Sequence, residues 1–410
     1  MHDRDVDPAH SALSTGERIR YWRERRGMSR EVLAGLVGKK PRWLKAVERG
    51  EIGDPKLPAL LDIADALRVR DVSELVGDPR APRNMFRGPG HPRLGEVRDA
   101  INAVAVPVSG PPPSLDHLRA RVDAAWRARH AAPDHRTVLG GLLPELIRDA
   151  RHAAKIYEGS ERRRALALLA GAYHLTQFFV AYQPSADLLW RVVERSLMTA
   201  EESEDPCAFA GAVWLAVQAH RDAGDFDAAE STNREALEAL KPRVDDAGPE
   251  LRALWGALHH EAAYTAARVG QDAVAWRWWE EADRVAQSLP ADFYEPLTSF
   301  SRVVMGAHAV TVAVESRKRG EATRQAEAHA SARIPSQPRR GRHLIEVARA
   351  WQLGGEKRSA LGTLQDAYVA APETIRYNGY AKQIVLELAR EPGTLRRDAR
   401  DLADRIGVLV

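Results

Sequence analysis

Cationic side chains gather in one short segment of this chain. Residues 29–49 read SREVLAGLVGKKPRWLKAVER. A guanidinium can pair with the O6 and N7 edge of guanine through two hydrogen bonds, whereas a lysine ammonium acts as a point charge on a phosphate. Arg42 is therefore predicted to contact a base. Lys39, Lys40 and Lys45 are predicted to contact phosphates and to make binding salt-dependent.

The charge of this region differs from that of the whole chain. Between Arg18 and Arg49 there are eleven arginines and lysines and three glutamates, a local net charge of +8, whereas the 410-residue chain carries only +3. Such a local patch is typical of one nucleic-acid-binding module joined to a neutral body. Trp43 has two interpretations, contact with a thymine methyl or sugar, or packing in the core of the module.

Five short helical patterns position these residues. Ser14 and Glu17 have capping-box spacing, and Ser29 can cap a second helix. Each of the first three helices is expected to end at a glycine, namely Gly27, Gly38 and Gly50. The apolar residues expected to face a common core are Ile19, Trp22, Val32, Leu33, Leu36, Leu44, Val47, Leu60, Leu61, Ile63, Ala64, Leu67 and Leu75. Two short helices joined by a glycine turn predict a helix-turn-helix, whose second helix enters the DNA major groove.

The segment resembles the Xre type of lambda-repressor-like DNA-binding domains. The resemblance is carried by MSREVLAGLVG (28–38), by ERG (48–50) and by LPALLDIADALRV (57–69). It implies that the third helix reads DNA. It also implies that Arg30 stands where the family usually has a phosphate-contacting Gln. Glu48 and Arg49 are interpreted as structural residues within the domain.

The composition changes twice along the chain. Residues 1–13 are polar and are expected to form a flexible tail, and residues 14–78 form the predicted DNA-binding domain. Residues 79–114 are rich in Pro and Gly and predict a linker, with one short helix in LGEVRDAINAVA. Residues 115–410 show helical periodicity throughout and no convincing alternating strand. The predicted fold class is all-α, a five-helix lambda-repressor-like domain followed by a tetratricopeptide-like α-solenoid.

The helical body contains similar segments. AGDFDAAESTNREALEAL (223–240) is close to the tetratricopeptide consensus, with Gly224 at the turn and Ala229 and Ala236 as the small residues of the second helix. Matching copies lie at 269–286 and 353–373, and weaker ones at 182–196 and 319–332. Small residues let paired helices approach, and stacked pairs bury a continuous core.

The spacing of these copies is unusual. From Gly224 to Gly270 it is 46 residues, longer than the 34 of the tetratricopeptide family. Either the helices or loops are longer, or divergent copies lie between.

Aromatic residues are frequent in the second clear repeat. Adjacent Trp278 and Trp279 cannot face the same way on a helix, so one is expected in the core and the other at a groove or interface. Core packing is the simpler interpretation for the group, and a ligand groove or dimer contact is the alternative. The residues assigned to that alternative are Trp255, Tyr264, Trp276, Trp279, Tyr377 and Asn378.

Catalytic signatures are missing from the sequence. It contains no GxSxG and no GxxxxGK[ST] motif. His259, His260 and Glu261 do not form HExxH, because adjacent histidines cannot share a helix face. We therefore expect no enzyme activity, no metal and no cofactor. An enzyme with a site in the helical body is the weakest of the alternatives.

The remaining features concern location and partners. The single cysteine, Cys207, excludes an intramolecular disulfide and is expected to be a small buried residue. No signal peptide or membrane span is evident, so a cytoplasmic, nucleoid-associated protein is expected.

The layout is similar in plan to large regulators common in actinobacteria and to peptide-pheromone-sensing regulators of Gram-positive bacteria. The resemblance implies a sequence-specific transcriptional regulator that binds double-stranded DNA at an inverted repeat. The implied protein is a homodimer that senses a peptide, small molecule or protein, as in quorum sensing. The alternative is a protein-interaction scaffold with an accessory DNA-binding module.

Overall fold

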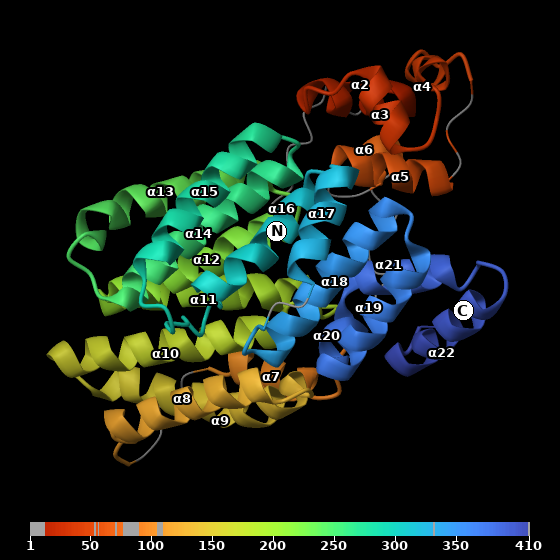
Figure 1. Ribbon diagram of the computed structural model, residues 1–410. Coiled ribbons are helices and arrows are strands. Elements are labelled where there is room, and N and C mark those ends of the chain that lie inside the picture. The colour runs from red at the N-terminus through yellow and green to blue at the C-terminus, as the bar shows by residue number, and fades with distance from the viewer. Residues whose placement is uncertain are drawn as a thin grey trace.

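The protein is helical wherever it is described. The computed structural model describes residues 13–52, 55, 57–69, 72–76, 90–104, 110–330 and 333–408. Every regular element in these ranges is a helix, as the all-α prediction requires (Figure 1). Most of the predicted tail, and residues 79–89 and 105–109 of the predicted linker, lie outside the described residues. None of the described helices is long and apolar enough to cross a bilayer.

Five helices of the N-terminal unit lie in the described part of the chain. The predicted capping box is present, because the Ser14 side chain accepts from the Glu17 amide and the Glu17 side chain accepts from the Ser14 amide. Ser29 caps the next helix, and Gly27, Gly38 and Gly50 all have positive φ, as the turns require. The helices of this unit are α2 (Thr15–Arg25), α3 (Arg30–Leu36), α4 (Pro41–Glu48), α5 (Leu57–Leu67) and α6 (Ser73–Val76).

Two apolar residues of this unit, Val32 and Leu61, do not lie where the sequence pattern places them. Val32 was expected inside, but its side chain is 51% exposed, whereas Leu33 and Ala34 are fully buried. The helix α3 is only seven residues long and packs on α4 and α5. These two helices cover only one face of α3, and Val32 does not lie on that face. Leu61 on α5 is exposed for the same reason.

The rest of the chain forms a stack of helical hairpins (Figure 1). Consecutive helices pack against each other along the chain. Their bounds are α7 (Leu94–Asn102), α8 (Leu115–Ala131), α9 (His135–Ile156), α10 (Gly159–Val180), α11 (Ala186–Ser203), α12 (Pro206–Asp222), α13 (Phe226–Val244), α14 (Pro249–Arg268), α15 (Asp272–Ser288), the 3-10 helix η2 (Arg302–Val304), α16 (Met305–Glu315), α17 (Arg319–His329), α18 (Gln337–Gly354), α19 (Lys357–Ala370), α20 (Pro372–Tyr377), α21 (Gly379–Leu388) and α22 (Thr394–Ile406).

The three clear repeats share one turn geometry. Gly224, Gly270 and Gly355 have φ of +79°, +82° and +83°, a region that only glycine enters at no steric cost. The predicted small residues that follow, such as Ala229 and Ala275, are fully buried. The 46-residue spacing comes from long helices, because α13 has 19 residues and α14 has 20.

The short helix expected in the linker is present as α7, and it packs on the body. Val97 and Ile101 are fully buried in the same core cluster as residues of α8, α9 and α10. Arg151 of α9 donates to the carbonyls of Ala100 and Ile101, at 2.8 and 3.0 Å. Residues 94–102 therefore belong to the folded body rather than to an extended connection.

The stack closes on itself. The helix α18 packs against α8, and the His130 ring nitrogen lies 2.8 Å from the Ser336 hydroxyl. Next to this contact, the Glu373 carboxylate of α20 accepts from the Arg136 and Thr137 amides and from the Thr137 hydroxyl, at 2.5 to 3.3 Å. A carboxylate at a helix N-terminus satisfies free amides and opposes the positive end of the dipole. Glu373 thus caps α9 from the far end of the chain.

The capping contacts also set the protonation of Glu373. Burial by itself raises the pKa of this carboxyl, but hydrogen bonds from His91, Thr137 and the Arg136 amide lower it to about 2. The stabilisation from Glu373 is therefore present above the ordinary pKa of about 4.5 and is lost as the pH falls towards 2.

Glu373→Gln is expected to lower the free energy of unfolding by about 1–3 kcal/mol, because it removes charged hydrogen bonds at the closure. Urea denaturation of the full chain at pH 7, followed by circular dichroism, measures the loss. The loss should shrink below about pH 4.5. Glu238→Gln, on the exposed face of α13, is the matched control. Equal stability of wild type and Glu373→Gln at pH 7 contradicts the capping role.

Candidate nucleic-acid interface and central cavity

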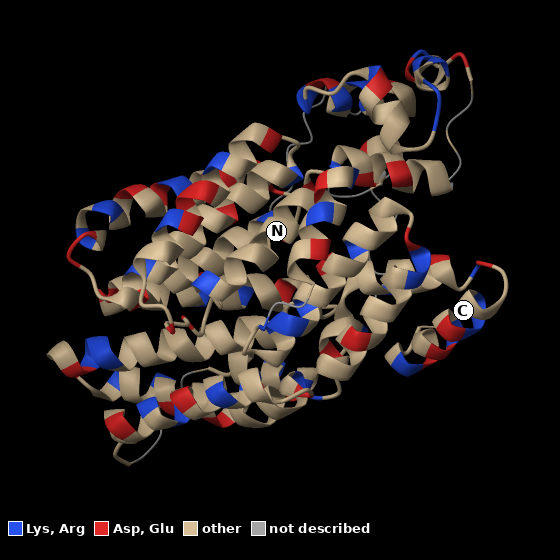
Figure 2. Ribbon diagram, in the orientation of Figure 1, with Lys and Arg blue, Asp and Glu red and all other residues tan. Residues whose placement is uncertain are grey.

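The face of α4 that is turned to solvent is cationic. Arg42 and Lys45 are three residues apart, so they lie on one side of the helix, and both are exposed. Lys39 and Lys40 precede the helix and are also exposed. In the part of the chain that the structure describes, none of the four forms an ion pair with a carboxylate. Figure 2 shows this basic segment on the outer side of the N-terminal unit.

Trp43 packs partly in the core, which is one of the two interpretations that the sequence left open. Its ring is half-buried and packs against the core of the N-terminal unit. The Lys39 ammonium lies 5.7 Å from the ring centroid, within the range of a cation–π contact. Trp43 therefore joins the core to the basic segment. Its contact with DNA stays a prediction.

A buried carboxylate holds the recognition helix in place. Glu48, at the end of α4, has a fully buried side chain that accepts from Arg23 of α2 and from Arg30 of α3, each at 2.6 Å. The hydrogen bonds that Arg23 donates to Glu48 raise the pKa of its guanidinium. The structural role inferred for Glu48 fits this network. Arg30 is tied to α4, and its role as a phosphate ligand stays a prediction. Arg49 is exposed and pairs with Glu51.

A close approach of backbones fixes α2 against α4. A Cβ added at Gly16 would overlap the carbonyl oxygen of Val47 and crowd the Cα of Glu48. Only glycine permits this packing, and the capping box at Ser14 starts α2 directly before it. The orientation of the basic face thus depends on a backbone contact as well as on Glu48.

The N-terminal unit is docked on the body through an arginine. Arg68 follows α5 with a positive φ and is buried, and its guanidinium donates to the carbonyls of Ala267 and Glu315. These carbonyls lie at the C-terminal ends of α14 and α16, where backbone acceptors lack helical partners and a cation is favoured. Burial lowers the pKa of Arg68 to about 9, while Glu315 opposes that shift.

Three further contacts support the docking. Arg317 pairs with Asp65 of α5, and Arg25 of α2 pairs with Asp227 of α13 at 2.9 Å. The Arg26 guanidinium lies 5.3 Å from the centre of the Phe226 ring. Figure 1 shows α5 and α6 next to the body and α4 on the outer side. Among the described residues, no hydrogen bond or ion pair joins α4 to the body, so its basic face remains accessible.

A cavity of about 190 Å³ lies at the centre of the closed stack. It is bordered by the inward sides of α8, α9, α10, α12, α14, α16 and α18. Its lining is rich in arginine and histidine, namely Arg129, Arg136, Arg221, Arg339, Arg342, His135, His260 and His308. Aromatic and aliphatic side chains, among them Phe178 and Trp214, complete the wall.

Two of the six residues suggested as ligand contacts line this cavity. Tyr264 of α14 is buried, and burial raises the pKa of its hydroxyl. Asn378 is also buried, but its side-chain oxygen accepts from the Ala381 amide and caps α21. Tyr264 thus remains a candidate ligand contact, whereas part of Asn378 is committed to a helix cap.

The other four suggested residues lie elsewhere. Trp255 packs against the core of α12–α15, and the centroid of its ring lies 4.1 Å from the centroid of the His259 ring. Trp276 and Trp279 pack edge to face, and the Trp279 indole donates to the Met305 carbonyl at 3.2 Å. Tyr377 lies under the Arg136 guanidinium. These contacts agree with the simpler interpretation of helix packing, and a ligand role for the four stays a prediction.

The remaining candidates from the sequence lie within the helical body. Glu261 pairs with Arg221, and His259 and His260 are buried neighbours on α14. No group of side chains suited to a metal ion occurs among the described residues. Cys207 is half-buried, and burial raises the pKa of its thiol to about 12.

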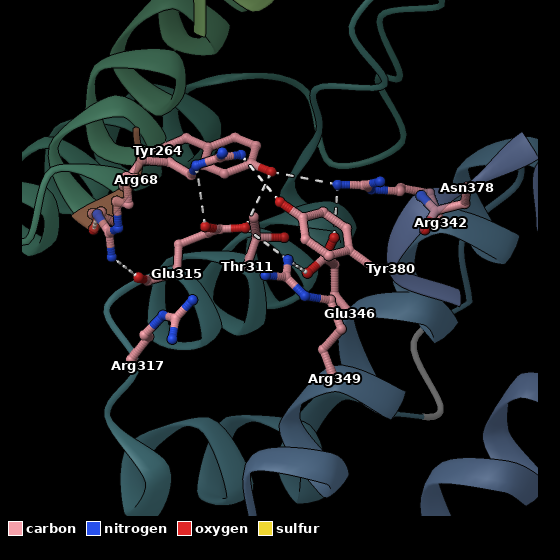
Figure 3. A network of polar contacts seen from close by, with 12 residues as sticks. Arg68, Tyr264, Thr311, Glu315, Arg317, Arg342, Glu346, Arg349, Asn378 and Tyr380 are labelled. Atoms are coloured by element: carbon pink, nitrogen blue, oxygen red, sulfur yellow. Dashed lines mark hydrogen bonds and ion pairs between the residues drawn. The ribbon is translucent and has the colours of Figure 1, made fainter. Parts of the chain in front are cut away.

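A network of ion pairs connects the cavity with the docking arginine (Figure 3). Arg342 donates to the Tyr264 hydroxyl at 3.3 Å and pairs with Glu346 at 2.8 Å. Arg349 bridges Glu346 and Glu315, at 2.6 Å to each. The backbone of the same Glu315 binds Arg68. Two cavity-lining residues, Arg342 and Tyr264, are therefore connected to the N-terminal unit through a chain of intervening contacts.

Comparison with known proteins identifies the N-terminal unit. Residues 15–75 match the family model of a helix-turn-helix domain. The unit α2–α6 is a helix-turn-helix domain. No curated protein matches the chain.

Solved structures give weaker likenesses. BtubC (BKLC) from P. vanneervenii has a TM-score of 0.38 and 13% identity, over 68% of this chain and 94% of its own. PlcR from Bacillus thuringiensis, in complex with the peptide PapR7 and DNA, has a TM-score of 0.28 and 12% identity, over 67% of this chain and 95% of its own. The apo form of the competence regulator ComR from Streptococcus vestibularis has a TM-score of 0.27 and 13% identity, over 98% of this chain and 99% of its own. All three TM-scores are below 0.5, so the similarity of this chain to the three structures is weak.

The cavity arginines were missed in the sequence, although one signal was present. Leu118, Val122, Ala125 and Arg129 are spaced by four, three and four residues, so they share one face of α8. An arginine that continues an apolar stripe indicates a buried cation. A count of charges cannot find it, because the chain is rich in arginine throughout.

Gly16→Ala is expected to lower the free energy of unfolding by about 1–3 kcal/mol, because the new methyl group forces α2 away from α4. Urea denaturation of the full chain measures the change. Gly35→Ala is the matched control, since Gly35 lies in α3 with open space around it. That control should be neutral or slightly stabilising. Unchanged stability of Gly16→Ala contradicts the inferred backbone contact.

Arg68→Gln is expected to loosen the docking of the N-terminal unit, because the carbonyls of Ala267 and Glu315 lose a buried cationic donor. Faster hydrogen exchange in α5 and a larger radius of gyration in small-angle scattering report the change. Asp62→Asn, on the exposed side of α5, is the control. Exchange and scattering equal to wild type would show that Arg68 does not hold the unit.

Proposed function

We propose that the protein is a sequence-specific DNA-binding transcriptional regulator with a signal-responsive helical body. The observation that carries the proposal is the exposed face of Arg42 and Lys45, preceded by Lys39 and Lys40, in a domain that matches the helix-turn-helix family. Four cations without carboxylate partners among the described residues form a surface suited to a polyanion.

The cations differ in their proposed roles. Arg42 lies in the first turn of α4, the part of a recognition helix that reaches base edges, and is proposed to read a guanine. Lys39, Lys40 and Lys45 are proposed to contact phosphates and set the register. Arg30 and Trp43 are proposed as flanking contacts at the margin of this face.

A homodimer is proposed as the DNA-binding form. Two recognition helices about 34 Å apart would contact successive major-groove faces of an inverted repeat. The body, residues 115–410 together with α7, is proposed to supply the dimer contact and the sensor, in the manner of tetratricopeptide-like repeats. Residues 14–78 are proposed as the DNA-binding domain, and the connection between them as the linker.

Signal response is proposed to act through the docking of Arg68. An effector that binds the body changes DNA affinity only if it interacts differently with two states of the protein. Here α14 and α16 line the cavity and also supply the carbonyls that bind Arg68. A shift of these helices would therefore change the placement of the recognition helix. Quorum sensing and a cytoplasmic, nucleoid-associated location belong to the same proposal.

Arg42→Ala is expected to weaken binding to a selected operator by about 1–3 kcal/mol and to relax specificity at one base pair, because one bidentate contact is lost. The operator is obtained by selecting random duplexes with the full chain, and affinities are measured by fluorescence anisotropy. Lys45→Ala should weaken all sequences alike and reduce the salt slope by about one.

Arg324→Ala, on the exposed side of α17, is the matched control. The reader role fails if selection enriches no sequence, or if both α4 variants keep the affinity and salt slope of wild type.

A further inference from the structure

The central cavity holds more cations than its carboxylates neutralise. Arg221 pairs with Glu261, and Arg342 pairs with Glu346. Three other lining arginines, Arg129, Arg136 and Arg339, have no ion pair with any carboxylate of the described residues. Their nearest polar partners are histidine nitrogens, at 2.9 to 3.4 Å, and the Ala181 carbonyl at 3.4 Å.

Two of these arginines are deeply buried with unused donors. Arg129 is 7% and Arg136 is 6% exposed, and the Nε of each has no hydrogen-bond partner in the described structure. Burial lowers the pKa of Arg129 to about 9 and also lowers that of Arg136, although Glu373 opposes the latter shift. An isolated buried cation is costly, so such residues are normally paired or serve a ligand.

The histidines of the cavity supply uncharged donors. Burial, together with the nearby arginines, lowers the pKa of His135 and of His260 well below the ordinary value, so both are neutral near pH 7. The Nδ1 atoms of His135 and His260 also have no partner among described groups. A neutral ring that carries its proton there can donate to an anion without adding a further buried charge.

The remaining wall is apolar, and the space is small. Phe178, Trp214 and Leu297 line the same cavity, and the Arg129 guanidinium lies 3.8 Å from the centre of the Phe178 ring. The volume of about 190 Å³ is below the roughly 300–1,000 Å³ of sites for drug-sized ligands. A small molecule fits these dimensions better than an extended peptide.

We propose that the central cavity binds a small organic anion. Its carboxylate or phosphate group lies between Arg129, Arg136 and Arg339, whose guanidinium forks match the geometry of both groups. Its apolar or aromatic part lies against Phe178 and Trp214. The anion supplies the negative charge that the arginines lack within the described protein.

The same site is placed to act on the N-terminal unit, an extension that rests on the proposed function. His260 and Tyr264 line the cavity from α14, and His308 lines it from α16. Both helices end at the carbonyls that bind Arg68, and Tyr264 contacts Arg342 and Glu315 in the connecting network (Figure 3). Binding of the anion therefore shifts the helices on which the DNA-binding domain is docked.

Binding is tested on the full chain without DNA. Benzoate, phenyl phosphate and inorganic phosphate are the anionic probes, and benzamide is the neutral match. The melting temperature of wild type should rise with the logarithm of benzoate or phenyl phosphate concentration, and benzamide should have little effect. The stronger of the two aromatic anions identifies the preferred head group. Inorganic phosphate should be weaker than phenyl phosphate, because it lacks the apolar part.

Variants locate the site. Arg129→Met should weaken binding of the preferred anion about ten- to hundredfold, because a charge-assisted hydrogen bond is lost. It should also melt no lower than wild type without ligand, since a costly buried cation is removed. Arg339→Met serves as the second variant. Arg127→Met, exposed on the same helix α8, and Arg42→Ala, on the DNA-binding face, should bind as wild type does.

The outcomes separate the two proposals. The anion site is overturned if no probe stabilises wild type, if benzamide stabilises it as much as benzoate, or if Arg129→Met and Arg339→Met both bind as wild type does. The extension to DNA is tested by adding the preferred anion to the selected operator complex. DNA affinity should change about fivefold or more in wild type and remain constant in Arg68→Gln, which still binds the anion. An anion that leaves wild-type DNA affinity unchanged overturns the extension alone.

Discussion

The architecture depends on the closure of the helical stack by Glu373. A solenoid of hairpins would otherwise leave an open concave face, with its polar side chains in water. Here a carboxylate near the C-terminal end of the chain binds the amides of Arg136 and Thr137 at the start of α9. The closure brings α8 and α18 together and turns the concave face into a central cavity. Arginines that a solvent-exposed groove would hydrate are thereby buried.

Arginines that bind the last carbonyls of helices recur as the connecting device of this protein. Arg68 binds the terminal carbonyls of α14 and α16, and Arg302 donates to three carbonyls at the end of α15. The last carbonyls of a helix have no internal partners, so a guanidinium with five donors satisfies several of them at once. The helix-turn-helix domain is thus attached to the body mainly by polar side chains. Contacts of this kind suit a junction that moves between two positions.

Parts of the fold followed directly from sequence patterns. The capping box at Ser14 and the turn at Gly38 use local signals, because the atoms involved lie within a few residues of each other. The repeat turn at Gly224 was likewise visible, since only glycine adopts that conformation without strain. Val32 was misplaced because its burial depends on which faces of a seven-residue helix are covered. The sequence predicted the helix α7 but placed it in the linker for the same reason, because its burial depends on packing against α9, which is distant along the chain.

By itself, the sequence determined an all-α chain with a basic helix-turn-helix at one end and a hairpin repeat behind it. Periodicity, helix caps and charge are local properties, so they can be recognised in the sequence alone. Tertiary structure decided which arginines gather around the cavity, since Arg339 of α18 joins Arg129 and Arg136, which flank the turn between α8 and α9, only when the stack closes. It also decided that Tyr264, rather than the tryptophans of α15, faces the cavity. Long-range packing sets such relations; among the three arginines, a local signal exists only for Arg129, which continues the apolar stripe of α8.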